Sequence, residues 1–296
     1  MGKFSSRDIV VTVSGDGYSK EIKDLHISAN VTYTLAGVPN VANIVIYNLS
    51  QVSRDMFSSI YDDDGKAVMA VSVSVDSKTI FTGDIVNVSS AHVTTEATWA
   101  TTIYGNEGWN AYQKTATVEA PKGTTREEIV KSLVNQLKNA GVDIINLVGL
   151  AKSGCGNKSI LKRLLFNGNV MENINKLISD CLPESDTFIA EKTINVLPKN
   201  SSIDETITID KVLEAPTLTE NGVTIKTQLN TDVKAGAKIN VVSKSFKAGF
   251  ANLSVNRVQR ERFSGAGTYK VVQLDHRVDN FSTEVAQTQI TGVYLP

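Results

Sequence analysis

Cysteine is scarce in this chain of 296 residues, with Cys155 and Cys181 as its only two. Two cysteines are too few for a disulfide framework or for a zinc site built from thiolates. Long apolar runs are also missing, and none approaches the roughly 20 residues that a membrane-spanning helix needs. The opening residues, MGKFSSRDIVVTVSG, lack the apolar core of a signal peptide, so we expect a protein that is made and kept in a cytoplasm.

An excess of charge of either sign is missing as well. The formal net charge is -1 and the pI is about 6.3, which excludes a strong overall attraction to nucleic acid or acidic membranes. Hydrophobic residues make up 41% of the chain, enough to bury a proper core, so a fully disordered protein is excluded. The length suits two or three domains.

The two cysteines lie in different local patterns. Cys181 falls on the apolar face of a predicted helix, where we expect a buried thiol. Cys155 lies in the glycine-containing loop KSGCGNKS. This loop is not a phosphate-binding P-loop, because Cys155 stands where the motif requires lysine. The sequence therefore predicts neither a phosphate site nor a disulfide here.

Alternating apolar and polar residues predict strands through the first third of the chain. Gly, Asp, Asn and Ser separate the apolar stretches, as in a barrel or a sandwich. The predicted strands cover residues 8–15, 23–35, 42–50, 68–75, 80–88 and 98–109, with a hairpin turn at residues 76–78.

A helical period replaces this alternation in the middle of the chain. One helix is predicted over residues 124–141, with a capping box of Thr125 and Glu128 at its start and Gly141 at its end. A second is predicted from Asn169 to Pro183, and its apolar face consists of Val170, Ile174, Leu177, Ile178 and Cys181. A short hairpin over residues 186–199 completes a compact α+β insert.

Strand patterns return in the last third. They cover residues 205–214, 216–230, 234–246, 250–263, 268–278 and 284–295, with glycine-containing turns between them. The predicted fold class is therefore mainly β with an α+β insert. We expect two barrel-like β domains, at residues 1–118 and 201–296, that flank a small helix-and-hairpin domain at residues 119–200.

The segment YKVVQLDHRVDN, residues 269–280, is the strongest candidate for chemistry. Asp275, His276 and Asp279 are residue types of metal sites and acid/base pairs. Neighbouring side chains of a strand face opposite sides, so the three cannot all converge. His276 and Asp279 could pair across the turn, and a metal would need further ligands. The sequence favours a structural corner over a metal or catalytic site.

The basic run RVQRER is the other candidate feature. Arg257, Arg260 and Arg262 suit a solvated strand, or the rim of a protein interface, where arginine is enriched. Aromatic residues that would stack on bases are not interleaved with them, which argues against nucleic-acid recognition. We therefore predict an interface that involves these arginines together with Asp275, His276 and Asp279.

Five segments in the same order resemble the baseplate hub proteins of contractile phage tails, the late-control family. They are ANIVIYNLS (42–50), IFTGDIVNV (80–88), the helix-and-hairpin stretch at 169–199, LEAPTLTENGVTIKTQLNTDVKAGAKINVVS (213–243) and YKVVQLDHRVDNFSTEVAQTQITGV (269–293). The last departs from the family pattern at Val278, where glycine is usual, and at Glu284, where tryptophan often stands. These departures indicate an altered corner loop.

The resemblance implies a mechanical function in a virion. Such a hub is a homotrimeric ring in the baseplate, made in the host cytoplasm, that joins the six-fold tail tube to the three-fold central spike. Its lumen lets the genome pass with only non-specific contact to DNA. The implied partners are a tube or tube-adaptor protein, the spike protein, and a tape measure protein and baseplate wedge proteins. No enzymatic activity, cofactor, metal or membrane segment goes with it.

Two other classes of function stay open at this point. A cell-wall hydrolase would use a carboxylate pair such as Asp275 and Asp279, although Trp99 and Trp109 are the only tryptophans that could build a sugar platform. A receptor- or carbohydrate-binding tail protein, or the hub of a related injection machine, is the second. Activity on peptidoglycan would indicate the hydrolase, and glycan binding by the isolated chain would indicate the binding protein.

Overall fold

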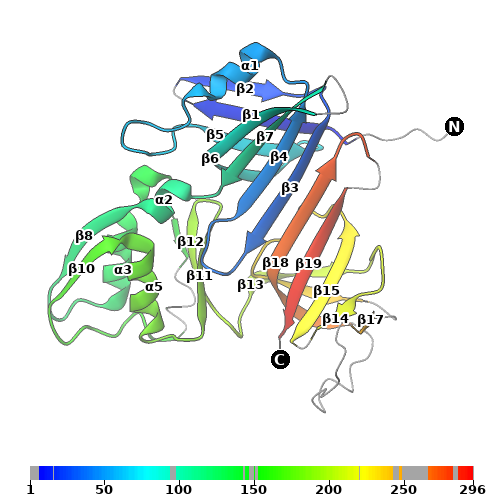
Figure 1. Cartoon of the computed structure of the whole chain (residues 1–296). Helices are drawn as coiled ribbons and strands as arrows, with labels where there is room; N and C mark the ends of the chain where they lie inside the picture. Colours follow the sequence, from blue (N-terminus) through cyan, green and yellow to red (C-terminus); the bar gives the residue numbers. More distant parts are fainter. Residues whose placement is uncertain are drawn as a thin grey trace.

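The computed structural model describes residues 7–15, 17–93, 98–142, 144–146, 150, 153–219, 221–242, 247–248, 266–282 and 286–295. A large sheet with few helices makes the fold mainly β, which confirms the predicted class (Figure 1). None of the described helices is long and apolar enough to cross a membrane. Arg257, Arg260 and Arg262, and the strand predicted over residues 250–263, lie outside the described residues.

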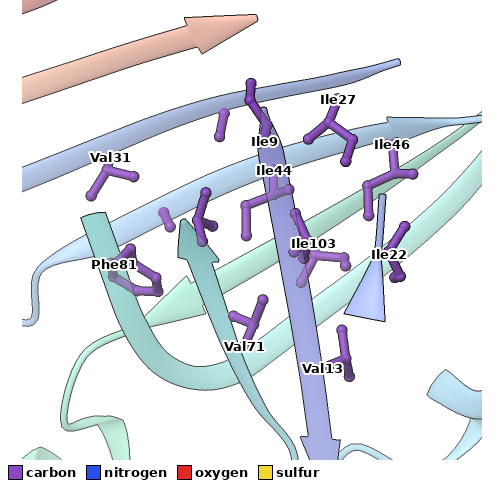
Figure 2. Packing of buried hydrophobic residues seen from close by; sticks show 14 of the residues in the cluster. Ile9, Val13, Ile22, Ile27, Val31, Ile44, Ile46, Val71, Phe81 and Ile103 are labelled. Carbon is purple, nitrogen blue, oxygen red and sulfur yellow. The ribbon is translucent and has the colours of Figure 1, made fainter. Parts of the chain in front are cut away.

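The first half of the large sheet curls around one apolar core. Its strands follow the order β3-β4-β7-β6-β5-β1-β2, and every ladder is antiparallel. Figure 2 shows the side chains of Ile9, Ile44 and Ile103 pointing into this core. The elements are β1 (Ile9–Gly15), β2 (Tyr18–Ile22), β3 (Ile27–Thr34), β4 (Val41–Tyr47), α1 (Gln51–Asp55), η1 (Met56–Ser58), β5 (Ala70–Val75), β6 (Lys78–Val93) and β7 (Thr98–Asn106).

Two glycines make room for Phe81 in this core. A Cβ atom on Gly83 would lie 2.7 Å from the ring of Phe81 and 2.8 Å from the backbone of Asn106. A Cβ atom on Gly105 would lie 2.8 Å from the same ring. Close-packed interiors leave no space for either atom. The glycine of the segment IFTGDIVNV is therefore required by packing.

The second half of the sheet has a smaller core of its own. β18 is its longest strand and lies between β19 on one side and β16 on the other. The elements are β13 (Ile203–Ile209), β14 (Thr217–Leu218), β15 (Gly222–Gln228), β16 (Ala237–Val241), β17 (Lys247–Ala248), β18 (Gly267–Asp279) and β19 (Gln287–Tyr294).

The strand β18 joins the two halves into one 14-stranded sheet. Its first residues, Gly267–Lys270, pair with β16, whereas Gln273–Asp279 pair with β3 of the first half. The change of neighbour coincides with a register shift between Val271 and Gln273 in the ladder with β19. In Figure 1, β3, β18, β19 and β15 accordingly lie side by side as one continuous surface.

The insert packs two helices and a hairpin around a third core. Strands β8 and β10 form one small sheet, and β11, β12 and β9 form another. Its elements are α2 (Trp109–Gln113), β8 (Thr115–Ala120), α3 (Arg126–Asn135), η2 (Lys138–Ala140), β9 (Ile144–Asn146), β10 (Leu164–Asn169), α5 (Val170–Ser179), β11 (Ser185–Ala190) and β12 (Thr193–Pro198). The core of the insert reaches back to Ala111, and the domain boundaries at 118 and 200 stay predictions.

Both predicted helices form, and their caps have the predicted chemistry. The side chain of Thr125 accepts from the backbone of Glu128, and Glu128 accepts in return from the backbone of Thr125, so the capping box is confirmed. Gly141 takes a left-handed φ of 83°, but only after the 3-10 turn η2. The second helix ends at Ser179 rather than at Pro183, since Cys181 and Leu182 both donate back to Ile178 in a tightened last turn.

Cys155 and Cys181 form a disulfide, which corrects the expectation of a buried thiol. Their Cα atoms lie 5.9 Å apart, a normal separation for bonded cysteines. The bond ties the loop that holds Cys155 to the end of α5. Sequence spacing could not reveal it, because the two cysteines, separated by 26 positions in the sequence, come together only when the insert packs.

Removing this bond should destabilise the insert. Cys155→Ser combined with Cys181→Ser is expected to lower the free energy of unfolding by about 3 kcal/mol. The disulfide links positions that are 26 apart in the sequence, and without it the unfolded chain regains the conformational entropy that this cross-link removes. Urea unfolding of the wild type with and without dithiothreitol gives the matching comparison. The reductant should reproduce the loss in the wild type and leave the double variant unchanged. Two titratable thiols in the unreduced wild type would contradict the bond.

Candidate functional site at the junction of the three parts

The strand β18 places the residues of the segment 269–280 on opposite faces of the sheet. His276 is 3% exposed and lies on the core face, whereas Asp275 and Asp279 lie on the other face. The Nδ1 atom of His276 lies 2.9 Å from the Oγ1 atom of Thr288. That hydroxyl oxygen also accepts a hydrogen bond of 2.9 Å from the backbone of Asn230. His276 therefore belongs to the packed interior.

Burial also sets the charge of His276. Loss of solvent lowers the pKa of its imidazole to about 4, and the nearby Asp275 carboxylate opposes this only partly. The ring is therefore neutral at pH 7. The hydroxyl of Thr288 can donate to Nδ1 in this state, which leaves the Nε2 proton on the ring.

The buried imidazole predicts an acid-sensitive fold. An unfolded histidine takes up its proton near pH 6.5, whereas the folded protein resists protonation until about pH 4. The unfolded state binds more protons between these values, so stability falls as the pH is lowered through this window, by about 3 kcal/mol in total. Urea unfolding at pH 7 and pH 4.5 should show a smaller difference for His276→Gln than for the wild type. His92→Gln, on the exposed end of β6, is the control that should keep the wild-type difference.

Asp279 pairs with a histidine of the first half rather than with His276. Both carboxylate oxygens lie 3.2 Å from Nε2 of His26, and Oδ1 also accepts from the backbone of Phe281 at 2.8 Å. The ring of His26 is stacked between Tyr47 and Phe281. The pairing of His276 with Asp279 that the sequence left open is therefore not formed. Asp279 instead contacts His26, which lies 253 positions earlier in the sequence. This contact fixes a corner between the two halves.

A glycosidase pair at Asp275 and Asp279 does not fit this strand. Residues four apart on one strand are separated by about 13 Å, more than the roughly 5–10 Å between glycosidase carboxylates. Asp275 is also occupied, since its oxygens accept from Thr32 at 2.6 Å and from Gln273 at 3.0 Å. Within the described ranges no group of three or more His, Cys, Asp and Glu could hold a metal ion.

A buried carboxylate that no sequence motif indicated connects the first half to the insert through hydrogen bonds. Glu107 is 9% exposed and accepts from the side chain of Asn40 at 2.7 Å and from the backbone of Glu191 at 2.5 Å. Asn40 also donates to the carbonyl of Ile189 at 3.2 Å. Burial raises the pKa of Glu107 above its ordinary value, against the lowering effect of the bond from Asn40. Glu191 in turn binds Lys234 of the second half.

A buried lysine ties the second half to the insert. Lys270 is 1% exposed, and its Nζ atom lies 2.8 Å from a carboxylate oxygen of Asp186. The same ammonium group donates to the carbonyls of Pro198 and Lys199 at 3.3 and 3.4 Å. Alternation in β18 puts Lys270 opposite the core residues Tyr269 and Val271. The insert hairpin covers that face, which is why a lysine is buried there.

The three parts line a partly open pocket of about 310 Å³ where they meet. Its wall includes Tyr33 from the first half, Asn195 from the insert, and Val233, Leu274 and His276 from the second half. The hydroxyl of Tyr33 is already used, since it donates to the carbonyl of Ile80 at 2.6 Å. The polar groups described at this junction mainly bind one another, so the arrangement suits holding three parts together.

Comparisons with known proteins place this fold among tail proteins. No family model and no curated protein matches the sequence. The 43 kDa tail protein of prophage MuSo2 from Shewanella oneidensis matches in structure with a TM-score of 0.62 and 9% identity, over 98% of this chain and 97% of that one. A tail protein from Neisseria meningitidis matches with a TM-score of 0.58 and 10% identity, over 96% of both chains.

A type VI secretion protein has the same fold. The E. coli protein c3393, a component of that system with structural similarity to the T4 bacteriophage tail proteins gp27 and gp5, matches with a TM-score of 0.56. The identity is 9%, over 96% of this chain and 77% of that one. At such low identities the likeness shows a shared fold. The predicted interface residues are not tested by it.

Proposed function

We propose that this chain is the structural hub of a contractile phage tail, a trimeric ring in the baseplate between the tail tube and the central spike. The observation that carries the proposal is the likeness to a prophage tail protein over nearly the full length of both chains. A match that includes both halves and the insert supports a shared architecture rather than one shared domain. The five segments that resemble the late-control family point the same way.

The organisation of the sheet supports a ring. Within the described residues, β2 pairs only with β1, β17 only with β14 and β13 only with β16, so the branched large sheet has three edge strands. Exposed edges invite aggregation unless another element covers them. In a closed ring of heterologous contacts, neighbouring copies can cover such edges. Two β-rich halves per chain would then give six similar units in a trimer, which matches a six-fold tube.

The contacts between the two halves and the insert suit a structural protein that transmits force. Lys270, Glu107 and the pair of His26 with Asp279 tie each part of the chain to the others. The polar groups of these contacts are engaged with each other. The interface predicted for Asp275, His276 and Asp279 together with the three arginines stays a prediction. We infer a structural protein rather than an enzyme.

The position and copy number of the chain test the proposal. A cryo-electron microscopy reconstruction of the assembled particle should show three copies around the tail axis, between tube and spike. The isolated chain can be monomeric, because closing the ring costs association entropy that the tube or spike offsets. Six copies, or a position on a peripheral fibre, would contradict the hub.

The hub of a related contractile injection machine is the second candidate. The likeness to a type VI secretion component favours it. The two candidates differ in cargo. A purified particle that carries this chain together with a DNA-filled head would indicate a phage tail, whereas a headless particle would indicate an injection machine.

A further inference from the structure

A buried hydrogen-bond donor of His276 has no acceptor in the part of the chain that the structure describes. The hydroxyl of Thr288 accepts from the backbone of Asn230 and donates to Nδ1 of His276, so the neutral ring carries its proton on Nε2. The described residues give this Nε2–H group no hydrogen bond. Buried polar groups in folded proteins are nearly always bonded, so a donor of this kind calls for an explanation.

The Nε2–H group faces the pocket where the three parts meet. His276 is only 3% exposed. Among the described residues, the fully enclosed side-chain atoms without a partner are Oδ1 of Asn43 and Nε of Arg126. Nε2 of His276 is not one of them and therefore reaches open space. Because His276 lines the pocket, that space is the pocket.

The other polar side chains of the described wall are bonded or can reach water. Asn195 donates to the carbonyl of Thr193 and accepts from the side chain of Asn146, each at 3.2 Å. The hydroxyl of Tyr33 donates within the chain, and that of Thr231 is half-buried, so water can reach it. The imidazole N–H is thus the donor that a molecule in the pocket would satisfy.

The charges around the pocket are paired. Lys234 and Glu191 lie on its wall and bind each other at 2.5 Å. Lys78 and Asp232, which adjoin wall residues, bind each other at 3.0 Å. All four side chains are exposed, and each pair joins a cation to an anion. The pocket therefore offers no net charge to a ligand, which favours a neutral molecule.

The remaining wall is apolar, and its size suits a small ligand. Its apolar members are Ile80, Ala190, Ile203, Val233, Ala235 and Leu274. Ligand pockets combine such a wall with a few well-placed polar groups, and they are common where domains meet. An apolar cavity of about 150 Å³ binds benzene. The pocket of about 310 Å³ therefore has room for two fused rings.

We propose that this pocket binds a small neutral molecule, mainly apolar and about the size of two fused rings, that accepts a hydrogen bond from Nε2 of His276. All the walls belong to one chain, so the site does not depend on the proposed hub function. Because the wall includes residues of both halves and of the insert, a bound molecule stabilises the arrangement in which these three parts meet.

Quinoline and naphthalene test the site in the full chain at pH 7. The two molecules have the same shape, and only the ring nitrogen of quinoline can accept a hydrogen bond. Both should bind the wild type in a saturable way, as measured by NMR titration, and both should raise its melting temperature. Quinoline should in addition move the resonance of the His276 Nε2–H proton downfield, as a new hydrogen bond does, and naphthalene should not.

Two variants separate the hydrogen bond from the apolar wall. His276→Phe keeps a ring but removes the donor, so it should weaken quinoline binding by about fivefold. Naphthalene binding should not change in this variant, which makes it the control for an intact pocket. Ala190→Leu places a larger side chain in the wall and should weaken the binding of both probes by about tenfold or more.

Three results would overturn the proposal. They are a lack of saturable binding of quinoline to the wild type up to its solubility limit, an equal effect of His276→Phe on the two probes, and unchanged binding of both probes to Ala190→Leu. If His276→Phe does not fold, the Nε2–H resonance of the wild type and the Ala190→Leu variant decide. A bound quinoline that leaves that resonance in place would then refute the role of His276.

Discussion

Leu177→Asp should destabilise the insert more than any other single change considered for this chain. Leu177 is 3% exposed on α5 and packs in the core of the insert with Ile174 and Ile178. An aspartate there removes a large apolar side chain and buries a carboxylate without a partner, so the expected loss is at least about 4 kcal/mol. Urea or thermal unfolding followed by circular dichroism measures it.

A second substitution to aspartate on the same helix provides the control. Asn175 is only half-buried, and Asn175→Asp should change the free energy of unfolding by less than about 1 kcal/mol. Because both variants carry the same new charge, the difference between them isolates burial. Equal melting temperatures for Leu177→Asp and the wild type would mean that the face of α5 is assigned incorrectly.

Lys270→Met should give the second largest loss. Methionine keeps most of the apolar stem of Lys270 but leaves Asp186 and two backbone carbonyls without their donor. Breaking a buried ion pair by removing one partner typically costs about 3–5 kcal/mol. Since Asp186 keeps some contact with solvent, we expect the lower end of this range. The measurement is the free energy of unfolding in urea.

An exposed ion pair gives the matched comparison. Lys226 binds Glu214 at a similar distance, but both side chains are 39% exposed, so Lys226→Met should cost no more than about 1 kcal/mol. Asp186→Asn added to Lys270→Met should recover part of the loss, because no carboxylate is then left unpaired. A loss for Lys270→Met as small as that for Lys226→Met would show that the buried pair does not hold the insert to β18.

The sequence by itself determined the features that depend on neighbours along the chain. The alternation in β1, β3 and β4 predicts strands because each side chain faces the side opposite to its neighbour. The capping box at Thr125 and the apolar face that includes Leu177 are likewise complete within one or a few helical turns. Such patterns need no knowledge of the rest of the fold.

Only the tertiary structure decided which distant segments meet. The ladder of β18 with β3, the contact of His26 with Asp279 and the bond of Cys155 with Cys181 join residues far apart in the chain. Lys270 shows the limit most clearly. The alternation of its strand gives a lysine on the solvent side, yet the insert hairpin covers that side and buries it. Whether a polar residue of a strand is exposed depends on what packs over it, and local sequence does not contain that information.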